Sequence, residues 1–330
     1  MDFHSFPPSP QSPLDRRHFL RQSGILATGL ASTLPVIGSE KKQPSSETLV
    51  KTFYDSLTEE QRNKICFNYD HPLRLKVENN WQITKMKVED FTKDQQAMIR
   101  AIFMSLHSEQ YAQIVYDQVE WDSGLDGFAG GSSVALFGSP GSGKFEFVLT
   151  GRHCTRRCDG DSEEGVALGG PIFYGHAAQS FNEKADHQDN AYWYQALQAN
   201  KVYAMLDGKQ RQQALCQQSR GEHGRKTVQL TGKKRGLEGI RVGELANDQQ
   251  GEVKKVIGDL LAPFREYDAK EALRYIEAGG LENLHMAFYQ NENIGNDEIW
   301  DVWQIEGPSM ICYFRGKPHV HAWMHIRKPS

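Results

Sequence analysis

The end of the chain alternates between two kinds of side chain, and this alternation constrains the fold more than any other feature. From His319 to Arg327 the sequence is HVHAWMHIR. Successive side chains of a β-strand point to opposite faces, so the three histidines and the tryptophan would share one face. The opposite face would be apolar enough to pack on a core. Its members are Val320, Ala322, Met324 and Ile326.

The spacing of these histidines favours a metal site. His319 and His321 would stand ~6.5–7 Å apart at the backbone on one strand face, so both rings could reach a single ion. His325 would lie ~13 Å along the strand from His321, too far to share that ion easily. It would then sit behind the ligands or face solvent. The alternative for all three is an exposed face of an edge strand, where polar side chains guard against aggregation.

Helices and strands fall in separate blocks, which predicts an α+β fold. Residues 45–121 are mainly helical in pattern, and capping signatures at Thr58 and Thr92 mark two helix starts. Residues 122–330 mix strands and helices, and they end in an antiparallel meander. We therefore expect a single domain over residues 45–330, in which a mainly helical N-terminal part packs with a largely antiparallel sheet. The expected meander strands are 284–289, 298–306, 309–314 and 319–327.

The first 44 residues resemble a disordered start followed by a twin-arginine export signal. Arg16 and Arg17 precede Phe19-Leu20, and a weakly apolar stretch follows from Ile25 to Gly38. That stretch of ~14 residues is too short to span a bilayer, so no stable membrane span is expected in the mature protein. The signal predicts a periplasmic or secreted protein, with the leader cleaved or retained. A chance arginine pair before an amphipathic helix is the alternative.

One Gly-rich motif resembles a phosphate-binding loop and is better explained as a turn. Gly138-Ser139-Pro140-Gly141-Ser142-Gly143-Lys144 is followed by Phe145, where a phosphate-binding loop needs Ser or Thr and the start of a helix. The residues from Phe145 to Leu149 alternate like a strand instead. We expect a hairpin turn and no nucleotide. The formal charge of −4 likewise gives no reason to expect a nucleic-acid partner.

Further metal-binding candidates lie near the middle of the chain. His153 follows the strand that starts near Lys144, and it would lie at the rim of the sheet if that strand ends at Gly151. Cys154 and Cys158 could form a disulfide or supply a thiolate ligand. His176 follows a glycine that lets the backbone approach a neighbour closely. The basic stretch 217–236 is expected to be a solvated loop.

Several short motifs occur in a recognisable order, and together they resemble the bacterial family called domain of unknown function 3500 over roughly residues 47–327. The resemblance implies export and a meeting of His153 with the strand of His319 and His321, but it names no activity. Members typically have Gly-His-His where this chain has Gly151-Arg152-His153. The motifs are the helix starts near Gln61 and Gln95, Gly151-Arg152-His153, the segment from Pro171 to Gly175, the helix after His187, Gly307-Pro308 and His319-Val320-His321.

The working hypothesis is an exported metal-binding protein, and specifically a metal-dependent hydrolase or oxidoreductase. Zn, Cu or Fe would suit an imidazole site. His187, flanked by acidic residues, could act as a general base, and Arg152 could hold an anionic or other small-molecule substrate. The alternative is a non-catalytic exported module whose histidines and aromatic side chains, including Tyr192-Trp193-Tyr194, contact a sugar or peptide. The expected metal ligands are His153, His176, His319 and His321.

Overall fold

An eleven-stranded, mostly antiparallel β-sheet organises the described residues of the computed structural model, which are 45–177, 190–291 and 300–329. The strand order is β1-β2-β3-β4-β5-β11-β10-β9-β8-β6, and β7 pairs with β8. The pairs β1–β2 and β6–β8 are parallel. The strands are β1 (Cys66–Phe67), β2 (Ser133–Gly138), β3 (Phe145–Gly151), β4 (Cys154–Cys158), β5 (Ile172–His176), β6 (Leu215–Cys216), β7 (Ile240–Arg241), β8 (His285–Tyr289), β9 (Val302–Glu306), β10 (Met310–Arg315) and β11 (Val320–Ile326).

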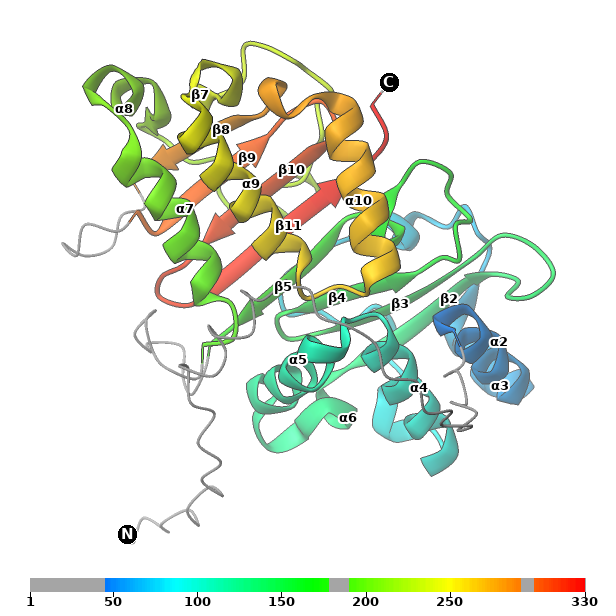
Figure 1. Cartoon of the computed structure of the whole chain (residues 1–330). Helices are drawn as coiled ribbons and strands as arrows, with labels where there is room; N and C mark the ends of the chain where they lie inside the picture. Colours follow the sequence, from blue (N-terminus) through cyan, green and yellow to red (C-terminus); the bar gives the residue numbers. More distant parts are fainter. Residues whose placement is uncertain (1–44, 178–189, 292–299, 330) are drawn as a thin grey trace, which may run out of the picture. The chain divides into compact units, whose positions relative to one another are not determined.

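Helices cover one face of this sheet. In Figure 1, α7, α9 and α10 lie over the strands of the C-terminal half, and α2 and α4–α6 lie beside β2 to β5. This confirms the predicted α+β fold, including the mainly helical N-terminal part and the C-terminal meander. The helices are α2 (Ser46–Ser56), α3 (Glu59–Ile65), α4 (Lys93–Ser105), α5 (Glu109–Asp122), α6 (Gly127–Gly131), α7 (Trp193–Met205), α8 (Gly208–Ala214), α9 (Asn247–Leu261) and α10 (Glu266–Gly279).

The described residues all fall within one unit, Pro44–Ser330. The expected twin-arginine leader lies outside them, and so does His187. Among the residues that are described, no helix combines the length and apolarity needed to cross a membrane.

The two predicted helix starts are built as capping boxes. Thr58 accepts a hydrogen bond from the backbone of Gln61, and the Gln61 side chain accepts one from the Thr58 backbone; Thr92 and Gln95 repeat the arrangement. Each box satisfies backbone donors that a helix start leaves unpaired. The two glutamine side chains also hydrogen-bond to each other, with Gln61 Nε2 2.8 Å from Gln95 Oε1. The caps therefore tie α3 to α4.

The face of the sheet opposite the helices is covered by irregular chain. Residues 68–90 and 217–239 lie over it and bury two apolar clusters that are separate from the main core. Trp81–Ile83, whose aromatic and β-branched residues favour a strand, is irregular. Ile83 is buried in this covering layer, and its backbone N–H donates to Thr150 Oγ1 on β3 at 2.9 Å, so a side chain replaces strand pairing. The Gly-rich residues 127–131, whose composition favours a loop, form the single turn α6.

The Gly-rich motif is the predicted hairpin turn. β2 and β3 pair antiparallel across it, from Ser133 opposite Thr150 to Gly138 opposite Phe145. Gly138 has a φ of 75°, and a Cβ there would lie 2.1 Å from the carbonyl oxygen of Lys144. Glycine is thus required for the turn itself, which accounts for the motif without a phosphate.

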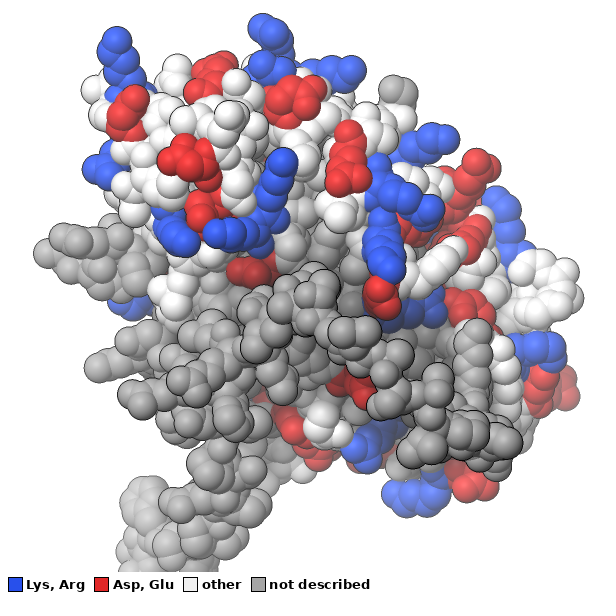
Figure 2. Space-filling model, viewed as in Figure 1, with Lys and Arg blue, Asp and Glu red and all other residues white. Residues whose placement is uncertain are grey.

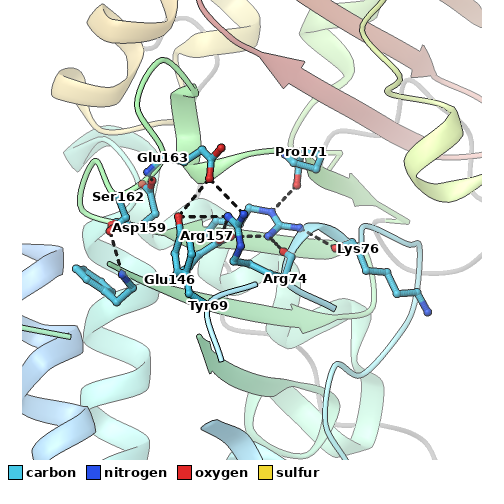
Figure 3. A network of polar contacts seen from close by, with 10 residues as sticks. Tyr69, Arg74, Lys76, Glu146, Arg157, Asp159, Ser162, Glu163 and Pro171 are labelled. Atoms are coloured by element: carbon cyan, nitrogen blue, oxygen red, sulfur yellow. Dashed lines mark hydrogen bonds and ion pairs between the residues drawn. The ribbon is translucent and has the colours of Figure 1, made fainter. Parts of the chain in front are cut away.

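A buried ion-pair network holds the covering segments onto β3 and β4 (Figure 3). The Glu146 carboxylate lies between two guanidinium groups, with Oε2 3.0 Å from Arg74 Nη1 and Oε1 2.6 Å from Arg157 Nη1. Arg157 also donates to the carbonyl oxygens of Pro171 and Lys76, at 2.6 and 2.7 Å. Because these bonds occupy all three guanidinium nitrogens of Arg157, its role is to hold the fold together.

Acidic and basic side chains are interspersed on the face that carries the helices (Figure 2). This mixture is typical of an ordinary solvated surface. The expectation that the protein binds no nucleic acid stays a prediction.

Candidate metal centre

Three of the four predicted metal ligands meet inside the protein. One nitrogen from each of His153, His319 and His321 lies within 4.8 Å of the others. His321 Nε2 is 2.9 Å from His319 Nε2 and 3.1 Å from His153 Nε2. Two nitrogens bound to one tetrahedral zinc ion at about 2.0–2.1 Å stand about 3.3 Å apart, so these separations are close to those of a bound set.

Strand geometry brings two of the histidines together as the alternation predicted. Val320 and its apolar neighbours on β11 pack into the core beneath the helices, whereas Trp323 packs in the opposite apolar layer. His321 shares the face of Trp323, and His319 lies just before the strand begins. His153, His319 and His321 are each at most 6% exposed. The alternative, an exposed face of an edge strand, is therefore wrong, because β11 lies between β5 and β10.

The third histidine comes from the tight turn between β3 and β4. β3 ends at Gly151 as expected, and Gly151 pairs with Cys154 across the turn. His153 has a φ of 53°, in the left-handed region that costs a residue with a side chain roughly 1–2 kcal/mol. This backbone conformation belongs to the turn that places the His153 ring at the rim of the sheet, beside His321.

Close packing of β5 against β11 depends on a glycine. Gly175 lies opposite His321, and a Cβ at this position would lie 2.2 Å from the carbonyl oxygen of Val320 and 3.2 Å from the His321 ring. This confirms the expected close approach at the glycine before His176. The missing side chain leaves room for the His321 ring.

A buried carboxylate lies behind His153. Asp122, the last residue of α5, has Oδ2 2.7 Å from His153 Nδ1. Gln118 Nε2, one helical turn earlier, donates to the same oxygen at 3.1 Å. Burial alone would raise the pKa of Asp122, but hydrogen bonds with His153 and His176 hold that pKa well below its ordinary value. Asp122 is therefore ionised at neutral pH.

A second carboxylate lies behind His321. Glu222, in the irregular segment that covers the sheet, has its two oxygens 2.8 and 2.9 Å from His321 Nδ1. Trp323 Nε1 donates to Glu222 Oε1 at 3.3 Å. Burial opposes ionisation, yet the contact with His321 lowers the pKa of Glu222 to about 2. Two of the three rings are thus each oriented by a carboxylate, an arrangement common among metal-binding histidines.

These carboxylates fix which ring nitrogen carries the proton. An ionised carboxylate can only accept, so Nδ1 of His153 and of His321 must donate, and each Nε2 is left with its lone pair. Burial lowers the pKa of His153, and it lowers the pKa of His321 to about 3, so both rings are neutral at pH 7. Two lone pairs that face each other across 3.1 Å cannot form a hydrogen bond. A cation between them would satisfy both.

Of the remaining predicted site residues, His176 and Arg152 are described and lie beside the histidine cluster. His176 is buried, and its Nδ1 is 3.3 Å from Asp122 Oδ1, so it shares the carboxylate with His153 instead of joining the three facing nitrogens. Arg152 precedes His153 in the turn, and its charge contributes to the low pKa of that ring. His325 lies outside the cluster, as the strand spacing predicted. His187 is not among the described residues.

The cysteines and the other arginines of this region serve the fold. Cys154 and Cys158 are buried free thiols at opposite ends of β4, and burial raises the pKa of Cys154 to about 11. Four residues along a strand separate them by ~13 Å, too far for a disulfide. Arg156 donates from Nε to His107 Nε2 at 3.0 Å and from Nη1 to the carbonyl oxygen of Phe173 at 2.8 Å.

Sequence reasoning missed both carboxylates and found no role for Asn79. Nothing sets Asp122 apart from the other acidic residues near the end of α5. Glu222 carried a weak signal, since it is an acidic residue that directly follows Gly221 in an otherwise basic segment. Asn79, from the covering segment 68–90, has Nδ2 3.4 Å from His321 Nε2.

The chain belongs to the family described as protein of unknown function (DUF3500), whose model matches residues 40–329. This confirms the resemblance seen in the sequence. No curated protein and no solved structure matches the chain.

Proposed function

We propose that the protein binds one transition-metal ion through His153, His319 and His321 and uses it in catalysis. The observation that supports this most strongly is the convergence of three buried Nε2 atoms, two of which belong to rings oriented by ionised carboxylates. His153 and His321 are buried with their lone pairs facing each other across 3.1 Å, and a positive ion between them would satisfy both.

The ligand count supports an enzyme over a purely structural metal site. Structural zinc sites usually have four protein ligands, whereas catalytic sites keep three and leave a position for water or substrate. With zinc, the ion would lower the pKa of bound water and supply hydroxide for hydrolysis. With copper or iron, an oxidation would be the natural reaction. His176, which shares Asp122 with His153, and Arg152, which directly precedes His153, are the candidates to assist either reaction.

The competing idea of an aromatic ligand-binding surface has less support. Tyr192 and Trp193, at the start of α7, are at most 2% exposed and pack in the core, so they offer no surface for a sugar or peptide. Trp323 is 1% exposed and donates to Glu222. These rings serve packing and the metal centre.

Metal content tests the proposal. Protein purified without chelator should contain close to one equivalent of Zn, Cu or Fe by elemental analysis, and His319→Ala combined with His321→Ala should abolish it. His285→Ala is the matched control, because this histidine lies on β8 outside the cluster and should leave the metal content unchanged. Equal metal in all three proteins, or none in any, would refute the centre. The element found then decides which class of substrate to assay.

We also propose that the protein is exported through the paired arginines of its leader. The support is the order of features in residues 16–38, which is the order of a twin-arginine signal. Export of the full-length protein should stop when Arg16 and Arg17 are both changed to Lys. Unchanged export of that variant would show that the arginine pair is not a signal.

A further inference from the structure

A guanidinium group lies directly beside the cluster of histidine nitrogens. Arg315 pairs with His321 across β10 and β11, so the two side chains share one face of the sheet. Arg315 Nη2 is 2.7 Å from His321 Nδ1 and 3.0 Å from His321 Nε2. A metal ion bound at that Nε2 would therefore have a fixed positive charge as an immediate neighbour.

Arg315 is only partly neutralised where it lies. Within the described part of the chain its acidic neighbour is Glu222, with 3.5 Å between Nη1 and Oε2. The same carboxylate already accepts from His321 Nδ1 and Trp323 Nε1. Arg315 Nε is buried and has no hydrogen-bond partner within the described part of the chain. The guanidinium thus keeps donor capacity beside the cluster.

The side-chain amide of Asn79 also lies close to His321 Nε2. Asn79 Nδ2 is 3.4 Å from His321 Nε2, and Asn79 Oδ1 is buried without a hydrogen-bond partner among the described residues. The covering segment therefore brings one neutral donor to the place where Arg315 brings a charged one. Two N–H donors from different elements face one small region next to the facing lone pairs.

We propose that this region binds an oxyanion, so that the substrate of the metal centre carries a carboxylate or phosphate group. The inference rests on the proposed metal function. A divalent ion and a guanidinium within a few ångströms repel each other unless an anion lies between them. A carboxylate or phosphate oxygen on the metal can accept from Arg315 and from Asn79 Nδ2 at once, since guanidinium donors match such groups in geometry. A neutral sugar or alcohol would leave the guanidinium uncompensated.

Cobalt makes the proposal measurable, because anion binding to Co²⁺ changes its visible absorption spectrum. The full protein loaded with one equivalent of Co²⁺ is titrated separately with acetate and with inorganic phosphate. We expect a saturable spectral change, and the anion that binds more tightly identifies the acidic group. Arg315→Gln should weaken anion binding about 10- to 100-fold, the usual range for losing a charged hydrogen bond. Asn79→Ala should weaken it about 3- to 10-fold.

Two further variants keep the result interpretable. Arg274→Gln removes an exposed arginine on α10 and should bind the anion like the unchanged protein. Arg315→Lys keeps the positive charge but loses the planar guanidinium group, so its anion affinity should fall between those of the unchanged protein and Arg315→Gln. If Arg315→Gln does not fold, a weaker anion affinity of Arg315→Lys tests the role of Arg315 in its place. Full cobalt binding with no anion effect, or with equal anion affinity in every variant, would overturn the oxyanion site and leave the metal centre standing. Failure of the unchanged protein to bind cobalt would overturn both.

Discussion

The carboxylate behind His153 offers the most direct test of how the centre is organised. Asp122→Asn removes one negative charge while keeping the size of the side chain, and the amide oxygen can still accept from His153 Nδ1. Asp122 Oδ2 lies 2.7 Å from that nitrogen, in a position where both side chains are at most 2% exposed. The His153 ring would keep its place, but it would no longer face the full negative charge of Asp122, which makes the ring's Nε2 a stronger electron donor.

The expected loss follows from the contacts. Removing a carboxylate behind a metal-binding histidine typically costs 10- to 100-fold in metal affinity, which corresponds to about 1.4–2.7 kcal/mol. Glu222→Gln should cost a similar amount through His321. Because the two carboxylates act on different rings, the losses should add in free energy, and the double variant should bind metal about 10²- to 10⁴-fold more weakly.

Competition with a zinc-binding dye measures these affinities in the purified, metal-free protein. Asp126→Asn is the matched control, since this exposed aspartate follows α5 and touches none of the rings. An affinity of Asp122→Asn within twofold of the unchanged protein would refute the reasoning, because Asp122 would then not act on the ligand. A double variant no weaker than either single variant would contradict the assignment of the two carboxylates to separate rings.

Three further predictions concern the fold around the centre. Gly175→Ala should lower zinc affinity at least about 10-fold in the same dye assay, because its methyl group would force β5 away from His321; an unchanged affinity would contradict the required close approach. Glu146→Gln should lower the free energy of unfolding in urea by about 3–5 kcal/mol, since it leaves the buried Arg157 without its acid and Arg74 with Glu163 alone; a loss below about 1 kcal/mol would contradict this. Burial raises the pKa of Asp159 from 3.8 to about 7. Between about pH 4 and about pH 7 the folded protein therefore keeps a proton on Asp159 that the unfolded chain loses, so the free energy of unfolding should fall as pH rises through this range. Asp159→Asn should flatten that slope and stabilise the protein at pH 8 by roughly 1–3 kcal/mol. An unchanged slope in urea unfolding across this range would show that Asp159 does not titrate there.

The sequence predicted the parts of the centre that obey a local period. The alternation along β11 placed His319 and His321 on one face, and the end of β3 placed His153 at the rim, because strand geometry relates neighbouring side chains directly. Asp122 and Glu222 follow no such rule. They come from the end of a helix and from an irregular segment, and only the packing of those elements on the sheet brings them to the rings. The residue types at Trp81–Ile83 favour a strand but do not form one for a related reason, since their side chains cover the sheet while their backbone does not pair with it.

The charges around the three rings indicate which oxidation state the centre suits. Among the side chains within hydrogen-bonding distance of the His153 and His321 rings, Asp122 and Glu222 contribute −2 and Arg315 contributes +1, while these two rings are neutral. A divalent ion brings the sum to +1, which one bound monoanion reduces to zero; a monovalent copper ion would reach zero with no anion. Because a buried charge that is not balanced is costly, anion binding should strengthen the retention of divalent metals and leave the retention of Cu⁺ unchanged. Zinc and cobalt affinities measured with and without acetate, against Cu⁺ affinity under reducing conditions, separate the two cases. An acetate effect of equal size on Cu⁺ would show that charge balance does not govern the site.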